Sequence, residues 1–77
     1  MTTSAAAVAA TAAAVRAAIE RAGLSVNRAA QLAGIPQSTL DRRLLGGTPG
    51  FTVSELSALA SVLGIDASSL VRQGAAA

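Results

Sequence analysis

The side chains best suited to chemistry in this sequence lie in one short polar segment. Residues 36–45 read PQSTLDRRLL and include Arg42 and Arg43, two of the chain's 6 basic residues, with Gln37 and Ser38 near the start. Glutamine can form two hydrogen bonds with an adenine, arginine can do the same with a guanine, and serine can bond a base or a phosphate. The segment therefore has the residue types of a DNA-binding surface.

The composition argues against the common catalytic and metal-binding chemistries. The sequence has neither cysteine nor histidine, which rules out a thiol nucleophile and a structural zinc site. Lysine is absent as well, and no two acidic residues stand close enough in sequence to suggest paired carboxylates for general acid–base catalysis. The acids are Glu20, Asp41, Glu55 and Asp66. We expect no enzymatic activity, no cofactor, no metal and no small-molecule ligand.

Good helix formers separated by glycines predict an all-α fold. Nothing from Ala5 to Ala22 breaks a helix, and alanine has the highest helix propensity. No segment shows the alternating pattern of a strand. The expected helices cover residues 5–22, 25–33, 36–45 and 53–63, with a fifth, short helix after Asp66 that contains Leu70 and Val71. We therefore predict a compact domain of five helices.

The predicted helix ends rest on capping residues. Ser25 and Thr52 stand where the N-caps of the second and fourth helices are expected. Glu55 follows Thr52 by three residues, the spacing of a capping box. Gly34 and Gly64 can take the left-handed conformation that ends a helix.

Apolar residues recur at helical spacing and predict the core. In the third helix Leu40 and Leu44 share one face. At 100° per residue, the opposite face holds Ser38, Asp41, Arg42 and Leu45. Further core positions are expected in the first helix at Val8, Val15, Ile19 and Ala22, and in the fourth at Val53, Leu56, Ala60 and Leu63.

The alanine-rich start of the chain has two possible structures. Residues 1–12 form either a tail or an extension of the first helix, and their small side chains do not decide between them. The apolar run reaches Arg16 before it is long enough to cross a bilayer, so we expect no membrane association. We expect residues 13–73 to form the folded domain and residues 74–77 to form a C-terminal tail.

The second and third helices are joined by a short turn that contains Gly34. Two helices joined in this way form a helix-turn-helix, whose second helix enters the major groove of DNA. The segment SVNRAAQLAGIPQSTLDRRLLGG, followed by FTVSELSALASVLGI, resembles the lambda-repressor-like (Cro/C1, Xre) helix-turn-helix family over roughly residues 15–70. The resemblance implies a five-helix, lambda-repressor-like helix-turn-helix domain.

The resemblance also implies the DNA-contacting residues. The residues just after the turn and one helical turn later contact bases in that family. Here these are Gln37, Ser38 and Arg42, with Thr39 and Asp41 beside them. We expect phosphate contacts from Ser25, Asn27, Arg28, Arg43 and Thr48. Arg43 lies nearer the core side of its helix, so its head is expected to reach either a phosphate or an acid.

Two classes of function fit these observations. In the first, the protein is a sequence-specific transcriptional regulator, a Cro-like repressor of phage type that inserts residues 36–45 into the major groove of a double-stranded DNA operator. It would act in the cytoplasm of a bacterial host, on the nucleoid, either as a homodimer or as monomers that pair on DNA. In the second, the same fold is a protein-interaction module such as an antitoxin or adaptor. The formal net charge of +2 is compatible with both.

Overall fold

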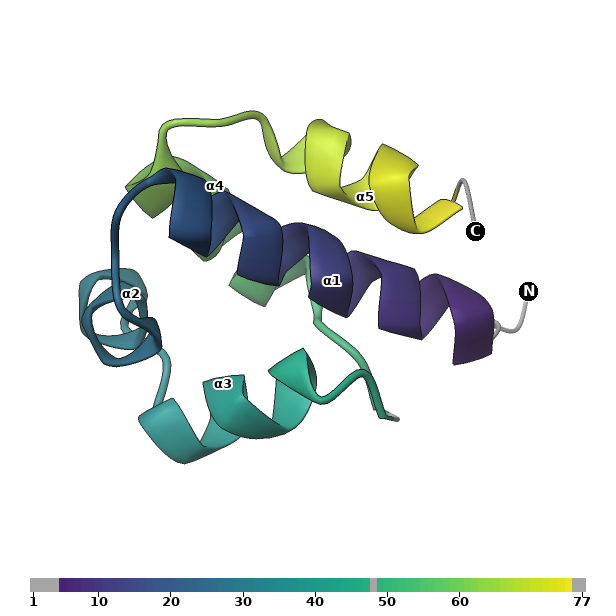
Figure 1. The fold of residues 1–77 in the computed structure, drawn as a ribbon, viewed down its shortest axis with the longest axis horizontal. Coiled ribbons are helices and arrows are strands. Elements are labelled where there is room, and N and C mark those ends of the chain that lie inside the picture. Colours follow the sequence, from purple (N-terminus) through teal and green to yellow (C-terminus); the bar gives the residue numbers. More distant parts are fainter. Residues whose placement is uncertain (1–4, 48, 76–77) are drawn as a thin grey trace.

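A computed structural model of the chain describes residues 5–47 and 49–75 and contains five α-helices and no strand within them (Figure 1). Residues 1–4, Thr48 and residues 76–77 lie outside the described part of the chain. The helices are α1 (Ala5–Arg21), α2 (Val26–Ala33), α3 (Gln37–Leu44), α4 (Val53–Leu63) and α5 (Ala67–Ala75). The prediction of an all-α fold with five helices is confirmed.

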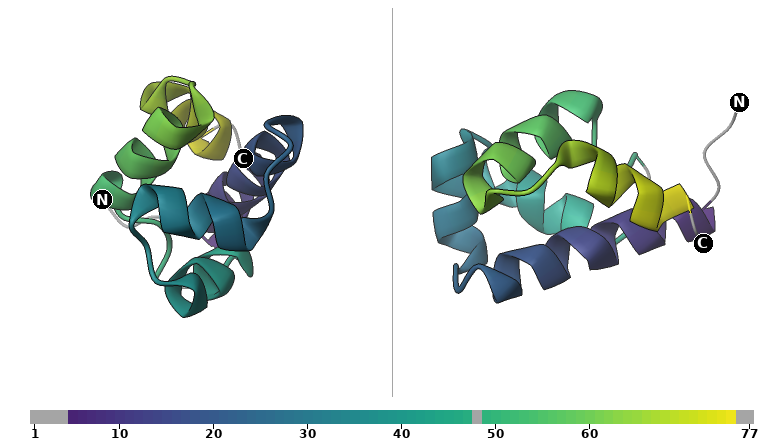
Figure 2. Two further views of the ribbon diagram at one scale, coloured as in Figure 1. Left: turned by 90° about the vertical axis from the view of Figure 1, so that its left-hand side faces the viewer. Right: turned by 90° about the horizontal axis from the view of Figure 1, so that it is seen from above.

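The long helix α1 runs between α5 on one side and α3 on the other (Figure 1). Helix α2 crosses the fold near the C-terminal end of α1, and α4 lies behind α1 in the same view. Turned views show α2 and α3 meeting at one end of the molecule, joined by a short turn (Figure 2). The fold thus places α3 at one edge of the molecule, on the opposite side of α1 from α5.

Most helix ends follow the predicted caps. The Ser25 side chain accepts a hydrogen bond from the Arg28 N–H at the start of α2. Thr52 and Glu55 form the predicted capping box at the start of α4. Gly34 and Gly64 end α2 and α4 in the left-handed conformation. These local signals are strong because a side chain or a glycine satisfies backbone groups that the helix leaves without partners.

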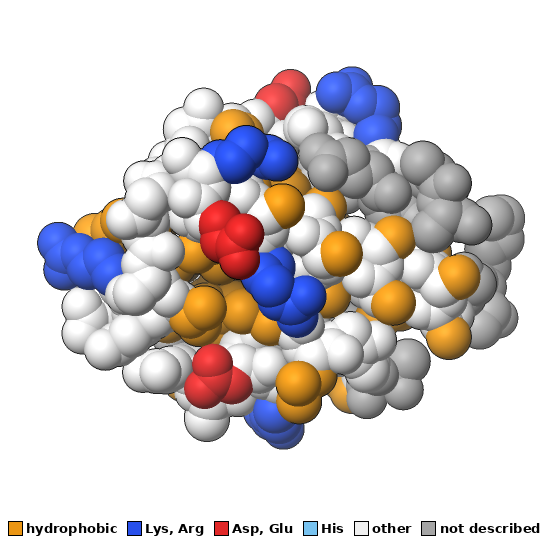
Figure 3. All heavy atoms as spheres, viewed as in Figure 1, with side chains coloured by type: hydrophobic (Ala, Val, Ile, Leu, Met, Phe, Trp, Pro, Cys, Tyr) orange, Lys and Arg blue, Asp and Glu red, His pale blue; other side chains and the backbone are white. Residues whose placement is uncertain are grey.

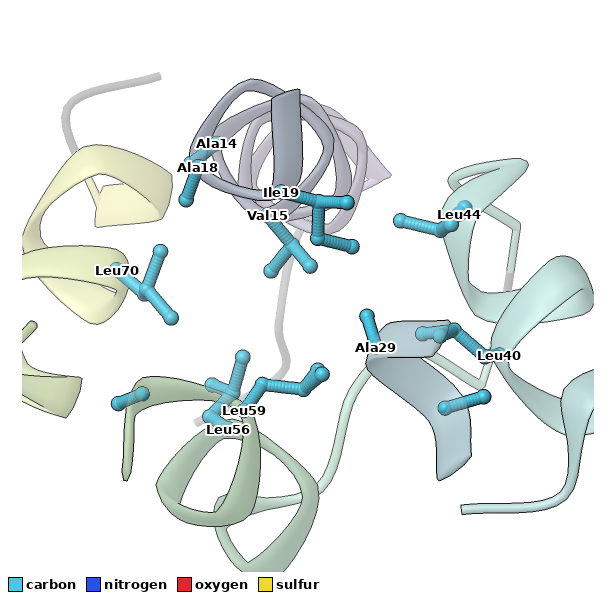
Figure 4. Packing of buried hydrophobic residues seen from close by; sticks show 12 residues of the cluster. Ala14, Val15, Ala18, Ile19, Ala29, Leu40, Leu44, Leu56, Leu59 and Leu70 are labelled. Atoms are coloured by element: carbon cyan, nitrogen blue, oxygen red, sulfur yellow. The ribbon is translucent and has the colours of Figure 1, made fainter. Parts of the chain in front are cut away.

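The core is formed where all five helices converge. Its most fully buried large side chains come from α1, α3, α4 and α5, and small alanines of α1, α2 and α4 fill the space between them (Figure 4). The largest fully buried side chains are Ile19, Leu40, Leu59, Leu70 and Val15. Small residues in α2 let that helix approach α3 and α4 closely, which brings the helix-turn-helix against the rest of the domain.

Two predicted core positions are wrong. Val53 is 80% exposed, because the buried face of α4 is centred on Leu56, Leu59 and Ala60, and the first residue of the helix lies at its edge. Ala22 is also exposed, since it follows the last residue of α1 and lies beyond the packed part of the helix. The buried side of α4 includes Leu59, which the predicted stripe omitted.

The described part of the alanine-rich segment is helical and packs against the loop that follows α3. Helix α1 begins at Ala5, and Val8 and Ala12 are buried. A Cβ atom added at Gly46 would lie 3.3 Å from the Ala9 Cα, and one added at Gly50 would lie 3.0 Å from a methyl carbon of Val8. The N-terminal half of α1 therefore forms part of the surface that supports the end of α3.

Candidate nucleic-acid interface

The turn between α2 and α3 is fixed by backbone hydrogen bonds. Gly34 has a positive φ of 72°, and the N–H groups of Gly34 and Ile35 donate to the carbonyls of Gln31 and Ala30 at 3.3 and 3.0 Å. Backbone hydrogen bonds of this kind, at a glycine with positive φ, end a helix and turn the chain in a new direction. Pro36 follows and stands immediately before α3. Ala29 and Ala30 are buried on the inner side of α2. The turn thus sets the angle between the two helices.

Helix α3 is anchored to the core by one face and exposed on the other. Leu40 and Leu44 are 0% and 7% exposed, as predicted. Leu45, directly after the helix, is 83% exposed. An eight-residue helix with two buried leucines is held in one orientation, so its outward side chains are presented in a fixed arrangement.

The residues predicted to contact bases lie together on the outer side of α3. Gln37, Ser38, Asp41 and Arg42 are exposed, and Thr39 is half-buried. Gln37 and Ser38 occupy the first turn of α3, which begins with no side-chain cap. The N–H groups of that turn are therefore available to an acceptor, together with the side-chain donors. The arrangement can recognise the edges of base pairs, and base contacts by these residues remain a prediction.

Three of the predicted phosphate-contacting residues lie around the start of α2, and a fourth, Arg43, lies in the last turn of α3. Ser25, Asn27 and Arg28 are exposed together around the start of α2. The Ser25 hydroxyl oxygen accepts from the Arg28 N–H at 3.0 Å, so its own O–H remains available as a donor. The Arg28 guanidinium bonds the Gln31 side-chain oxygen at 3.4 Å within the same helix. Thr48 lies outside the described residues.

Arg43 differs from its neighbour Arg42 in having partners within the protein. Its Nε lies 3.2 Å from Glu55 Oε1 in an ion pair, and its Nη1 donates to the Pro49 carbonyl at 3.0 Å. The contact with an acid, one of the two outcomes expected for this head group, therefore forms. Arg43 joins the end of α3 to the start of α4 and to the loop between them.

The environment of Glu55 favours its ionised form. Burial raises the pKa of Glu55, but hydrogen bonds from the Thr52 N–H, the Arg43 guanidinium and the Thr52 hydroxyl, together with the charge of Arg43, outweigh it. The net pKa of Glu55 lies below its ordinary value of 4.5. Glu55 is thus both a capping residue and the counter-ion of Arg43.

One side chain of α1, that of an exposed residue, contacts α3. The Arg16 Nη2 of α1 donates to the Leu44 carbonyl at the C-terminal end of α3. The two residues are 28 positions apart, and no local sequence pattern links them. This contact depends on the packing of α1 against α3, so it could not be predicted from sequence.

The positive charges are distributed over the surface. On the face shown in Figure 3, arginine side chains stand apart from one another, and acidic side chains lie among them. The Asp41 carboxylate, beside Arg42 in sequence, has no hydrogen-bond or ion-pair partner within the described residues. Affinity for an anionic partner therefore depends on where individual arginines lie more than on a continuous basic patch.

No helix in the described part of the chain has the length and hydropathy needed to cross a membrane.

In comparisons with known proteins, no curated protein and no solved structure matches the chain. A family model described as a helix-turn-helix domain matches residues 9–72, which is most of the chain. That range includes α2, the turn at Gly34 and α3, whose geometry is that of the motif. Membership suggests DNA binding, and such families are generally non-enzymatic. The chain belongs to the helix-turn-helix domain family.

Proposed function

We propose that this protein is a sequence-specific transcriptional regulator of the Cro-like repressor type. Helix α3 enters the major groove of a double-stranded operator, and Gln37, Ser38 and Arg42 contact base edges. Thr39 and Asp41 lie beside them, where Asp41 can accept from a cytosine amino group or orient Arg42. The protein acts on the DNA of a phage or its bacterial host, in the cytoplasm and on the nucleoid.

The observation that supports this proposal is the two-sided character of α3. Leu40 and Leu44 are buried, while Gln37, Ser38 and Arg42 are exposed and project from the same short helix. A polar outer face is usual for a surface helix, so the support lies in the types of these side chains, which are glutamine, serine and arginine on the second helix of a helix-turn-helix. These are base-reading residue types.

Phosphate contacts orient the helix in the groove. Ser25, Asn27 and Arg28 surround the N-terminus of α2, where backbone N–H groups and the helix dipole favour an anion. Arg43 belongs to the last turn of α3, and Thr48 follows that helix in sequence. Arg43 reaches a phosphate only if it exchanges or shares its contacts with Glu55 and Pro49. Phosphate contacts of this kind position a protein without reading sequence.

A single domain of this size contacts few base pairs. Regulators of this architecture reach specificity by placing two copies on half-sites about 34 Å apart. We propose two copies on the operator, either as a homodimer or as monomers that pair on DNA. Analytical ultracentrifugation with and without an operator duplex distinguishes these assemblies, because only a stable homodimer sediments as a dimer without DNA.

The proposal is tested by selecting duplexes from a random library and by measuring binding to DNA that flanks the protein's own gene. A regulator enriches one related set of sequences and binds them more tightly than a scrambled duplex. Its affinity should fall linearly with salt on logarithmic axes, with a slope of about 0.9 per phosphate neutralised. Absence of any enriched sequence, together with no binding to the flanking DNA, would falsify the regulator function.

A second candidate function is a protein-interaction module of the antitoxin or adaptor class. The observation that favours it is the exposure of Leu45 and Val53, at 83% and 80%, on either side of the α3–α4 loop. Exposed large apolar residues can form the centre of a protein interface. If this is the function, Leu45→Ser abolishes binding to an isolated partner protein and leaves DNA affinity unchanged.

A further inference from the structure

The carbonyl groups at the C-terminal end of α3 have three different partners. The Arg42 carbonyl accepts from the Leu45 N–H at 3.2 Å, and the Arg43 carbonyl accepts from the Gly46 N–H at 3.1 Å. The Leu44 carbonyl accepts from the Arg16 side chain of α1. The last carbonyls of a helix have no partner within it and must find one elsewhere. Arg16 supplies this partner from a different helix.

The contact joins two elements that otherwise meet through apolar side chains. Leu44 is packed in the core beneath the carbonyl that Arg16 binds. Gly46, two residues later, lies close against Ala9 of α1. Arg43 ties the same end of α3 to Glu55 of α4. The C-terminal end of α3 is thereby fixed from two sides, by a polar contact to α1 and another to α4.

The C-terminal end of α3 favours the positive charge of Arg16 as well as the N–H donors of its guanidinium. The C-terminal end of a helix carries partial negative charge, which a guanidinium stabilises. A hydrogen bond from a charged donor is also stronger than one between neutral groups. The side chain of Arg16 is therefore engaged with the protein at the end of the helix that carries the predicted base-contacting residues.

We infer that Arg16 is a positioning residue, which sets the direction of α3 through the Leu44 carbonyl and thereby the sequence discrimination of the outward face. The inference rests on the proposed DNA-binding function. Arg16 acts without touching DNA, because its guanidinium is engaged with the Leu44 carbonyl. A shift of the C-terminal end of α3 moves Arg42, two residues before Leu44, relative to a base edge and has less effect on contacts to phosphates.

Arg16→Gln and Arg21→Gln form a matched pair for the test. Both arginines are exposed residues of α1, and each substitution removes one positive charge. Arg21 has no side-chain hydrogen bond or ion pair within the described residues. A long-range effect of net charge should therefore be similar in the two variants, whereas loss of the α3 anchor occurs only in Arg16→Gln. Circular dichroism first establishes a temperature at which both variants are folded.

The first measurement is binding to a selected duplex and to a scrambled duplex over a range of salt concentrations. For Arg16→Gln we expect the ratio of the two affinities to fall about three- to tenfold, the range expected for the net contribution of one hydrogen bond. The salt slope should equal that of Arg21→Gln. Equal loss on both duplexes, with a slope shallower by about 0.9, would identify Arg16 as a phosphate contact and overturn the inference. An unchanged ratio would overturn it too.

The second measurement needs no DNA. Hydrogen exchange at the Leu45 and Gly46 amides, which close the end of α3, should be faster in Arg16→Gln than in the wild type and in Arg21→Gln. Unchanged exchange at both amides would show that Arg16 does not anchor the helix. Because this readout is independent of DNA, failure of the wild type to bind any duplex would refute the proposed function without being mistaken for a failure of the Arg16 anchor.

Discussion

At the scale of single residues, two adjacent arginines of α3 have different environments. Arg42 is exposed and has no side-chain partner within the described residues, whereas Arg43 is half-buried and bonds Glu55 and Pro49. Helical geometry alone predicts that the two point in different directions, because successive residues differ by 100°. Arg42 is therefore the residue of the pair that is available for an external partner.

The sequence predicted the direction of Arg43 but not its partner. Its position on the helix placed its head near either a phosphate or an acid, and both outcomes remained open. Glu55 stands 12 residues later, and its distance from Arg43 depends on how the α3–α4 loop folds. For Arg16 the separation is larger and the partner is a backbone carbonyl. Contacts of this kind require the tertiary structure.

The low pKa of Glu55 makes a contribution to stability that depends on pH. Because the folded state lowers this pKa, the ionised form stabilises the protein above the unfolded value near 4.5, and this contribution is lost as the pH falls through the folded value. Glu55→Gln keeps an acceptor for the capping box and removes the titration. We expect wild-type stability, measured by urea unfolding, to fall more than that of Glu55→Gln between about pH 5 and pH 3.

Asp66, whose pKa is also lowered by hydrogen bonds from Ser68, is present in both proteins. Its contribution therefore cancels when the two pH profiles are compared. Parallel profiles for wild type and Glu55→Gln would contradict the stabilising role assigned to the ionised Glu55.

At the scale of the elements, local signals predicted most helix bounds. Ser25, Thr52 and the glycines at positions 34 and 64 act within a few residues of their own position, so their effect is readable from sequence. The faces that helices bury were harder to predict. Val53 has the spacing of a core residue but lies at the edge of the first turn of α4, and only the placement of neighbouring helices exposes it.

The capping box of α4 provides a prediction for one element. Thr52→Ala removes the oxygen that accepts the Glu55 N–H at 3.1 Å, which should cost about 1 kcal/mol and lower Tm by roughly 4–8 °C for a domain of this size. Ser57→Ala is the matched control, since Ser57 is an exposed residue inside the same helix. Equal Tm values for the two variants in thermal unfolding would show that the capping box does not contribute to the stability of the protein.

The turn after α3 provides a second prediction at this scale. Gly46 has a positive φ of 81°, and an added Cβ would lie 3.3 Å from the Ala9 Cα. Gly46→Ala should therefore destabilise the protein by about 1–2 kcal/mol. Gly47→Ala is the control, because an added Cβ there meets nothing within 4 Å. Chemical denaturation measures both, and a Gly46→Ala variant as stable as Gly47→Ala would refute the close packing of this turn on α1.

At the scale of the whole molecule, the sequence could not decide the structure of its alanine-rich start. Alanine favours a helix but buries little area, so a tail and a helix extension remained open. Val8 and Ala12 are buried, and the close approaches at Gly46 and Gly50 bring the loop against this part of α1. Contacts between segments far apart in sequence therefore give the helix extension its role in the fold.

The distribution of charge over the whole molecule bears on the central proposal. The formal net charge is +2, so removing any one arginine changes the overall attraction to DNA by a similar amount. Arg42 belongs to α3 and Arg72 to α5, and these helices lie on opposite sides of α1. Both side chains belong to exposed residues. Comparing the two positions separates base recognition by α3 from a general effect of charge.

The most direct test of the proposed function is therefore the affinity of Arg42→Ala and Arg72→Ala for a selected operator duplex, with thermal unfolding as a check on folding. If α3 reads base pairs, Arg42→Ala loses about 1–3 kcal/mol of binding free energy on that duplex and little on a scrambled one. Arg72→Ala should bind both almost as the wild type does, and Tm should change little in either variant. Equal, small losses for the two variants on both duplexes would contradict base recognition by Arg42.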